Sequence, residues 1–116
     1  MSKGIIWHNP KCSKSRQTLQ LLQENGVEPE VFEYLSNPLT AEKIQEVAGQ
    51  LGMSARELLR TKENAYKEME LQDPAKTEAQ IIEAMIQNPK LIERPIYIFN
   101  GKAAIGRPPE QVLEII

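Results

Sequence analysis

The sequence predicts an α/β fold in which helices pack on a mixed four-stranded sheet. Three observations support this class: a strand, helix and strand pattern at the N-terminus, a helical middle third, and a hairpin signal before a final helical stretch. At 116 residues the chain has the size of one domain, which we expect to span residues 1–116 with a helical insertion over about 36–92.

The N-terminal segment predicts a strand-helix-strand unit. Residues 4–8 have the pattern of a short buried strand, residues 17–22 form the body of a helix, and Asn25-Gly26 is a helix stop signal. Residues 30–34 alternate polar and apolar side chains, as a second strand does. A crossover of this kind normally joins two parallel strands with a right-handed connection.

The middle third is predicted to be helical. Side chains suited to helix N-termini open three segments: Thr40, the pair Ser54 and Glu57, and the pair Thr77 and Gln80. Gly52 ends the first helix, and the Ser54 helix includes Leu58 and Leu59. Residues 64–76 are polar and weakly patterned, so we expect a surface excursion there.

The last third predicts a hairpin and a helix. Residues 96–99 and 102–105 are strand-like, and Asn100-Gly101 between them is a strong two-residue hairpin signal. Pro109 suits the first turn of a final helix that continues to Ile116. The complete order of elements is that of a thioredoxin-like fold with a helical insertion.

A proline marks a position of interest in that layout. Thioredoxin-like folds commonly place a cis proline opposite the thiol site, before the first strand of the hairpin, and Arg94-Pro95 occupies that place. The alternative is an ordinary trans proline that opens a strand, which general X-Pro frequencies favour.

Composition excludes several classes of function. Fourteen Lys and Arg against sixteen Asp and Glu give a net charge of -2, which does not favour a nucleic-acid partner. Apolar runs are too short for a membrane helix, and a single cysteine cannot form an internal disulfide, so we expect a soluble cytoplasmic protein. A monomer is the default expectation for its oligomeric state. Cys12 and His8 are too few ligands for a structural zinc site, so we expect no metal.

Cys12 is the main candidate for chemistry. It should lie at the N-terminus of the first helix, where unpaired backbone N–H groups favour a thiolate over a thiol. The alternative is a buried structural cysteine, because free cysteines are often buried. Polar and cationic neighbours favour the reactive interpretation: Lys11, Ser13, Lys14, Ser15 and Arg16.

The residues that follow Cys12 restrict its chemistry. Ser15 stands where the two-cysteine motif of thioredoxins has its second cysteine, so a redox reaction would need an external thiol such as glutathione or another protein. Thr18 stands where the Cys-x5-Arg loop of cysteine phosphatases requires arginine. The sequence therefore disfavours phosphate-ester hydrolysis.

Three arginines are candidates for binding an oxyanion beside Cys12: Arg60, Arg94 and Arg107. An oxyanion that approaches a thiolate is repelled by roughly 4 kcal/mol at 4 Å with an effective dielectric constant near 20. A guanidinium offsets this repulsion because it stays charged and donates paired hydrogen bonds. Each arginine taken alone is more often a solvated cation, so this expectation depends on their joint placement.

Six motifs define a family resemblance: His8-Asn9-Pro10-x-Cys12, Ser15-Arg16-x-Thr18-Leu19, Tyr34-Leu35-x-x-Pro38, Leu58-Leu59-Arg60, Arg94-Pro95-Ile96 and Arg107-Pro108. In these motifs, and over nearly its whole length, the chain resembles the arsenate reductases of the glutaredoxin-coupled, thioredoxin-fold type. It differs at Ser13-Lys14, where the best-known plasmid-borne members carry a glycine and a small polar residue.

The resemblance implies a function in arsenical resistance. Cys12 would form a covalent adduct with arsenate, and His8 and Ser15 would tune its thiolate. Arg60, Arg94 and Arg107 would bind the oxyanion and the arsenite product. Glutathione and glutaredoxin would supply the external thiols, and no cofactor would be bound.

Two other functions remain open from the sequence. One is a general glutathione-dependent thiol/disulfide reductase of the same fold, which would not need three arginines. The other is a non-catalytic regulator that binds RNA polymerase, as relatives with this fold do. Those relatives resemble redox switches with two cysteines, and Ser15 argues against such a switch here.

Overall fold

The computed structural model describes residues 4–37, 39–106 and 108–116. The chain divides into two compact units, each described separately below. The first unit combines Met1–Asn37 with Arg94–Ile116, and the second is the intervening segment Pro38–Glu93. The second unit corresponds to the segment in which the sequence predicts a helical insertion, while the assignment of one domain to the whole chain stays a prediction.

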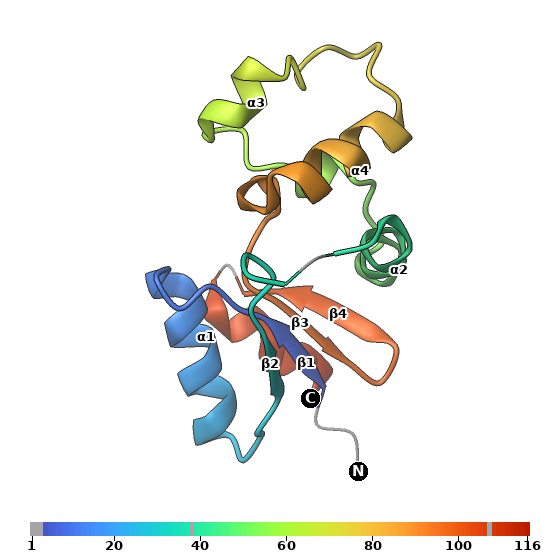
Figure 1. Ribbon diagram of the computed structural model, residues 1–116. Helices are drawn as coiled ribbons and strands as arrows, with labels where there is room; N and C mark the ends of the chain where they lie inside the picture. The colour runs from blue at the N-terminus through green and yellow to red at the C-terminus, as the bar shows by residue number, and fades with distance from the viewer. Residues whose placement is uncertain (1–3, 38, 107) are drawn as a thin grey trace. The chain divides into compact units, whose positions relative to one another are not determined.

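The first unit contains a four-stranded sheet in the order β2-β1-β3-β4 (Figure 1). Its strands are β1 (Ile5–Trp7), β2 (Glu30–Phe32), β3 (Ile96–Phe99) and β4 (Lys102–Ile105). β1 and β2 are parallel, whereas β3 runs antiparallel to both β1 and β4. The predicted α/β class with a mixed four-stranded sheet is therefore confirmed.

Two helical segments of the first unit pack on this sheet and enclose its core. These are α1 (Ser13–Glu24) and the 3-10 helix η3 (Pro109–Ile115), which pack against each other. The core takes one fully buried residue from each of β1, α1, β3 and η3: Ile6, Leu22, Tyr97 and Val112. The apolar positions of the sequence thus hold α1 in place, and with it the residue at its N-terminus.

The hairpin between β3 and β4 has the predicted two-residue turn. Asn100 and Gly101 both have positive φ, at 54° and 77°, as a type I′ turn requires. Asparagine and glycine tolerate this conformation better than other residues. The strands align Ile96 with Ile105, which fixes the register of the hairpin at its open end.

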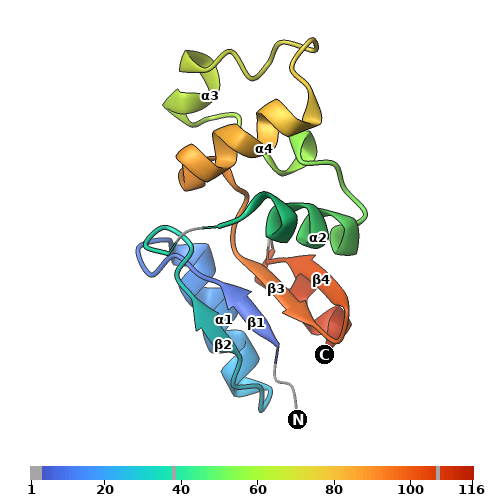
Figure 2. The ribbon, with the colours of Figure 1, turned by 45° about the vertical axis from the view of Figure 1, so that its right-hand side comes forward.

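The second unit is helical, as predicted (Figure 2). Its elements are α2 (Ala41–Leu51), η1 (Arg56–Leu58), α3 (Asn64–Glu68), α4 (Glu78–Gln87) and η2 (Pro89–Leu91). α2 and α4 pack against each other. Thr40 accepts a hydrogen bond from the Lys43 N–H, and Thr77 forms a reciprocal capping box with Gln80, so both predicted N-termini are confirmed.

Three helical segments differ from the predictions. Ser54 and Glu57 form their expected hydrogen bonds, but the segment makes only the short 3-10 helix η1. Its helix cannot continue because Leu59 is extended and bridges to Ile92. Residues 64–76 are not only an excursion, since they include α3, and the final helix is of the 3-10 type.

Among the residues that the structure describes, no helix has both the length and the apolar character needed to cross a bilayer.

Candidate active site

The N-terminus of α1 is formed by Cys12, which is its N-cap residue. Cys12 has extended backbone angles, with φ at -96° and ψ at 125°, and its carbonyl accepts the N–H of Arg16 at 3.0 Å. The Cys12 N–H donates to the Asn9 carbonyl at 3.0 Å, which closes a tight turn between β1 and α1. The side chain is partly exposed, so the predicted position at the helix start is confirmed and an external molecule can reach the sulfur.

Several groups around the Cys12 sulfur act on its ionisation. Burial opposes formation of the thiolate, but the backbone N–H of Ser15, the guanidinium of Arg94 and the N–H of Lys14 together hold the pKa of Cys12 below its ordinary value. These N–H groups at the start of α1 and the guanidinium all favour the thiolate over the thiol. The arrangement favours the thiolate, which is the form of cysteine that can act as a nucleophile.

Arg94 reaches this site from the start of β3. The peptide bond between Arg94 and Pro95 is cis, which is the arrangement expected for a thioredoxin-like layout. The Pro95 carbonyl accepts the Gly106 N–H at 2.9 Å, and Gly106 in turn lies close to the side chain of Thr18 on α1. The backbone that carries Arg94 is thus packed directly against the helix that carries Cys12.

The guanidinium of Arg94 has two partners in the first unit. Burial disfavours its charge, yet contacts with the Cys12 sulfur and the Tyr34 hydroxyl raise the pKa of Arg94 above its ordinary value. The guanidinium therefore stays protonated beside the sulfur at physiological pH. The sequence analysis did not single out Tyr34, because a tyrosine that ends a strand pattern is ordinarily a core residue.

His8 and Ser15 form a buried polar network below the Cys12 loop. Their Nδ1 and Oγ atoms lie 2.7 Å apart, and Ser15 Oγ accepts the N–H of Asn9 at 3.0 Å. Asn9 Oδ1 accepts the N–H of Lys11, also at 3.0 Å. These hydrogen bonds fix the loop between β1 and α1 that leads to Cys12.

The protonation of His8 follows from its surroundings. Burial lowers the pKa of His8, the charge of Glu33 acts in the opposite direction, and Arg16 adds to the lowering. A neutral imidazole with its proton on Nε2 can accept the Ser15 hydroxyl hydrogen at Nδ1, while the Ser15 oxygen accepts the Asn9 N–H. Ser15 acts on Cys12 through its backbone N–H, so the predicted tuning by His8 would pass through the loop.

The two other predicted oxyanion ligands are placed differently. Arg60 belongs to the second unit, where its Nη1 lies 3.1 Å from Glu93 Oε1 and its Nε lies 3.5 Å from Glu63 Oε1. Arg107 lies outside the described residues. Of the three arginines, the structure therefore brings Arg94 to Cys12, and the roles predicted for Arg60 and Arg107 stay predictions.

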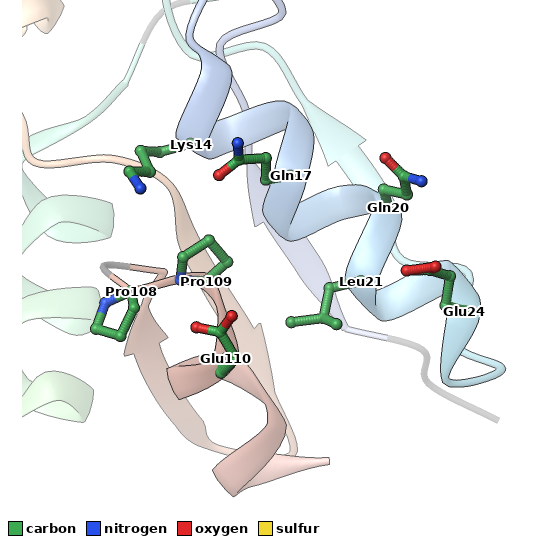
Figure 3. Close-up of a pocket in the computed structure, with 8 residues that line it drawn as sticks. All are labelled: Lys14, Gln17, Gln20, Leu21, Glu24, Pro108, Pro109 and Glu110. Carbon is green, nitrogen blue, oxygen red and sulfur yellow. The ribbon is translucent and has the colours of Figure 1, made fainter.

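A shallow pocket lies beside this site in the first unit (Figure 3). It has a volume of about 400 Å³, and Figure 3 shows α1 on one side and the start of η3 on the other. Its lining is Lys14, Gln17, Gln20, Leu21, Glu24, Pro108, Pro109 and Glu110. The lining has mixed polarity and both signs of charge. Among the described residues, no group of three His, Cys, Asp or Glu side chains is arranged to hold a metal ion.

Comparisons with known proteins place this geometry in a family. A model of the ArsC family matches residues 7–115. The chain is 61% identical to "Uncharacterized protein YfgD" of Escherichia coli K12, with 100% of this chain and 99% of that protein covered. It is 44% identical to an arsenate reductase of Haemophilus influenzae, with 97% of each chain covered.

A solved structure agrees with these sequence comparisons. The arsenate reductase from Vibrio cholerae is 48% identical, covers 97% of both chains and superposes with a TM-score of 0.95. The resemblance to arsenate reductases predicted from the sequence motifs is thereby confirmed. The chain belongs to the ArsC family.

Proposed function

We propose that the protein is an arsenate reductase that uses Cys12 as its nucleophile and external thiols as reductants. The observation that carries this proposal is the partly exposed Cys12 sulfur at the start of α1, held beside the Arg94 guanidinium. The sulfur supplies the electrons for attack, and the guanidinium offsets the repulsion between a thiolate and an incoming oxyanion. The named arsenate reductases among the relatives support the choice of substrate.

The reaction follows from this chemistry in three steps. The Cys12 thiolate forms a bond to arsenic of arsenate, and one arsenate oxygen leaves as water after protonation. Glutathione then forms an S–S bond with Cys12 while the S–As bond breaks. The electron pair of that bond stays on arsenic, which leaves as arsenite with arsenic reduced from the +5 to the +3 state.

A second thiol restores Cys12. Because Cys12 is the only cysteine, the mixed disulfide with glutathione cannot be resolved within the chain. Glutaredoxin would attack the glutathione sulfur, accept it as a new mixed disulfide and release the Cys12 thiolate. These thiols are maintained in a reducing compartment, so we place the reaction in the cytoplasm.

The proposed roles fall on residues beside the Cys12 sulfur and on two further arginines. Arg94 would bind the oxyanion during attack, since it contacts the sulfur that forms the bond. Arg60 and Arg107 would contribute further donors, as the family resemblance implies. His8 and Ser15 would keep the Cys12 loop in the conformation that points backbone N–H groups at the sulfur.

The test is a coupled assay that follows NADPH oxidation through glutathione reductase. Arsenate-dependent oxidation is expected with the unchanged chain, glutathione and glutaredoxin, and should vanish in Cys12→Ser. Thioredoxin and thioredoxin reductase in place of the glutathione system should give little turnover. If the unchanged chain reduces a glutathione mixed disulfide but never arsenate, it is a general thiol reductase and the proposal is wrong.

A further inference from the structure

The register of the sheet brings Tyr34 to the edge that carries Cys12. Trp7, the last residue of β1, pairs with Phe32 in β2 and with Ile96 in β3. β2 is parallel to β1 and β3 is antiparallel to it, so the residue two positions after Phe32 and the residue two positions before Ile96 emerge at the same edge. These two residues are Tyr34 and Arg94. The turn to Cys12 begins at this edge too, where the His8 N–H donates to the Phe32 carbonyl at 2.9 Å.

The Tyr34 side chain is fixed by packing. Only 1% of the residue is exposed, and its ring lies against Trp7 with the ring centroids 6.3 Å apart and the planes at 32°. Its hydroxyl oxygen is fully buried. A buried hydroxyl is costly unless a polar group accompanies it, and the polar group beside this one is the guanidinium of Arg94.

The Arg94 guanidinium thus lies between the fixed Tyr34 hydroxyl and the Cys12 sulfur. Arginine has a long side chain with several rotatable bonds, so its charge stays at one place only where other groups hold it. Tyr34 is held by Trp7 and has few degrees of freedom left. Cys12 is partly exposed, whereas Tyr34 is buried, so Cys12 is the partner of Arg94 that an incoming molecule can reach.

We propose that Tyr34 is a positioning residue, whose buried hydroxyl holds the Arg94 guanidinium against the Cys12 sulfur. It contacts neither substrate nor the reacting atoms, and acts only through Arg94. The inference concerns the site that the proposed function uses and rests on that function for its catalytic meaning. Its physical content, the control of Cys12 by Tyr34 through Arg94, can be measured without arsenate.

Other charged groups near the site bear on that measurement. In the described part of the first unit, Arg94 is the charged side chain that acts directly on Cys12. Behind the loop, His8 is acted on by Glu33 and Arg16, and it adjoins Ser15 rather than the sulfur. A test near neutral pH must therefore separate the effect of Arg94 on Cys12 ionisation from the titration of His8. A comparison of Tyr34→Phe with and without Arg94 does this, because His8 is present in both.

The experiment measures the rate of Cys12 alkylation by iodoacetamide as a function of pH. Tyr34→Phe keeps the ring on Trp7 and removes only the hydroxyl. We expect the midpoint of its alkylation profile to move to higher pH. The rate at pH 7, relative to the plateau at high pH, should fall about fivefold, as for the loss of one hydrogen bond of usual strength.

Two further variants make the result specific. In an Arg94→Ala background, Tyr34→Phe should cause no additional change, because the group through which it acts is gone. Tyr97→Phe is the matched control: this buried tyrosine of β3 stacks on Phe99, and its ring reaches Gly4 at the start of β1, away from Cys12. Its alkylation profile should match that of the unchanged chain.

A measurement on the unchanged chain covers the case in which Tyr34→Phe fails to fold. The Nε–H signal of Arg94 in a 15N spectrum, assigned with Arg94→Lys, should exchange slowly with solvent. The proposal is wrong if this signal exchanges as fast as that of an exposed arginine, if Tyr34→Phe leaves the profile unchanged, or if its effect is equally large without Arg94. A chain with the expected profiles but no arsenate turnover would refute the proposed function alone.

Discussion

Replacement of Gly106 by alanine should strain the contact between α1 and the segment that carries Arg94. A Cβ atom at position 106 would lie 2.5 Å from Thr18 Oγ1 and 2.8 Å from Pro95 Cγ. Neither neighbour can easily move. Thr18 is fully buried, and its hydroxyl donates to the Lys14 carbonyl at 2.8 Å. The Pro95 Cγ atom is part of the pyrrolidine ring, which is closed on the backbone nitrogen and has little freedom to move.

The size of the effect follows from this geometry. Overpacking of a well-packed interior typically costs about 1–3 kcal/mol. The entropy of unfolding for 116 residues is about 0.24 kcal/mol/K near 60 °C, so the melting temperature of Gly106→Ala should fall by about 4–12 °C. Cys12 and Arg94 lie on the two segments that are forced apart, so the rate of Cys12 alkylation at pH 7 should fall as well.

A second substitution tests the cause. Thr18→Ala removes both Thr18 atoms that the new Cβ would meet, and should restore part of the stability lost in Gly106→Ala. Thermal unfolding of the single and double variants, followed by circular dichroism, gives the coupling. Additive losses in the double variant, or a melting temperature unchanged in Gly106→Ala, would refute the steric reasoning.

Three more predictions address the site and the fold. Arg94→Ala removes a charge-assisted hydrogen bond worth about 1.5 kcal/mol at its lower limit, so the alkylation rate of Cys12 at pH 7 should fall about tenfold. An unchanged rate would show that Arg94 does not act on the sulfur. Thr77→Ala removes the cap of α4 and should cost about 1 kcal/mol in the free energy of unfolding, with the exposed Thr61→Ala as a neutral control. Equal losses in both would contradict the assigned cap. Burial lowers the pKa of His8 in the folded state, so the unfolded state binds its proton first, and stability should fall as pH drops below about 6.5. His8→Gln should flatten this part of the profile, and because the chain has one histidine, a slope that persists would assign it to other groups.

Local signals in the sequence predict much of the fold. The reciprocal pair of Thr77 and Gln80 and the turn at Asn100-Gly101 are specified by residues next to each other, and both occur as predicted. The segment after Ser54 could not be predicted in the same way. Its helix stops because Leu59 pairs with Ile92, which is distant in the sequence. The short helix α3 has no buried residue, so no apolar pattern marks it.

The candidate site also combines features that the sequence predicts with contacts that it does not reveal. The place of Cys12 follows from the adjoining strand and helix patterns, and the place of Arg94 follows from the thioredoxin-like layout. The contact between Arg94 and Tyr34 depends on the pairing of β1 with two other strands, which composition and spacing do not reveal. The ion pairs of Arg60 with Glu63 and Glu93 likewise arise partly from a contact between distant segments.

The use of cysteine as the N-cap residue of α1 has a consequence for the last step of any reaction at this sulfur. The N–H groups of Ser15 and Lys14 and the Arg94 guanidinium favour the thiolate over the thiol. When Cys12 is bound to another sulfur, it carries no charge, so the N–H groups and the guanidinium lose their interaction with the thiolate. A thiol that attacks such a disulfide therefore meets a good leaving group, because departure restores the favoured anion. The interactions that favour the Cys12 thiolate as a nucleophile therefore also favour it as the leaving group when the mixed disulfide is reduced.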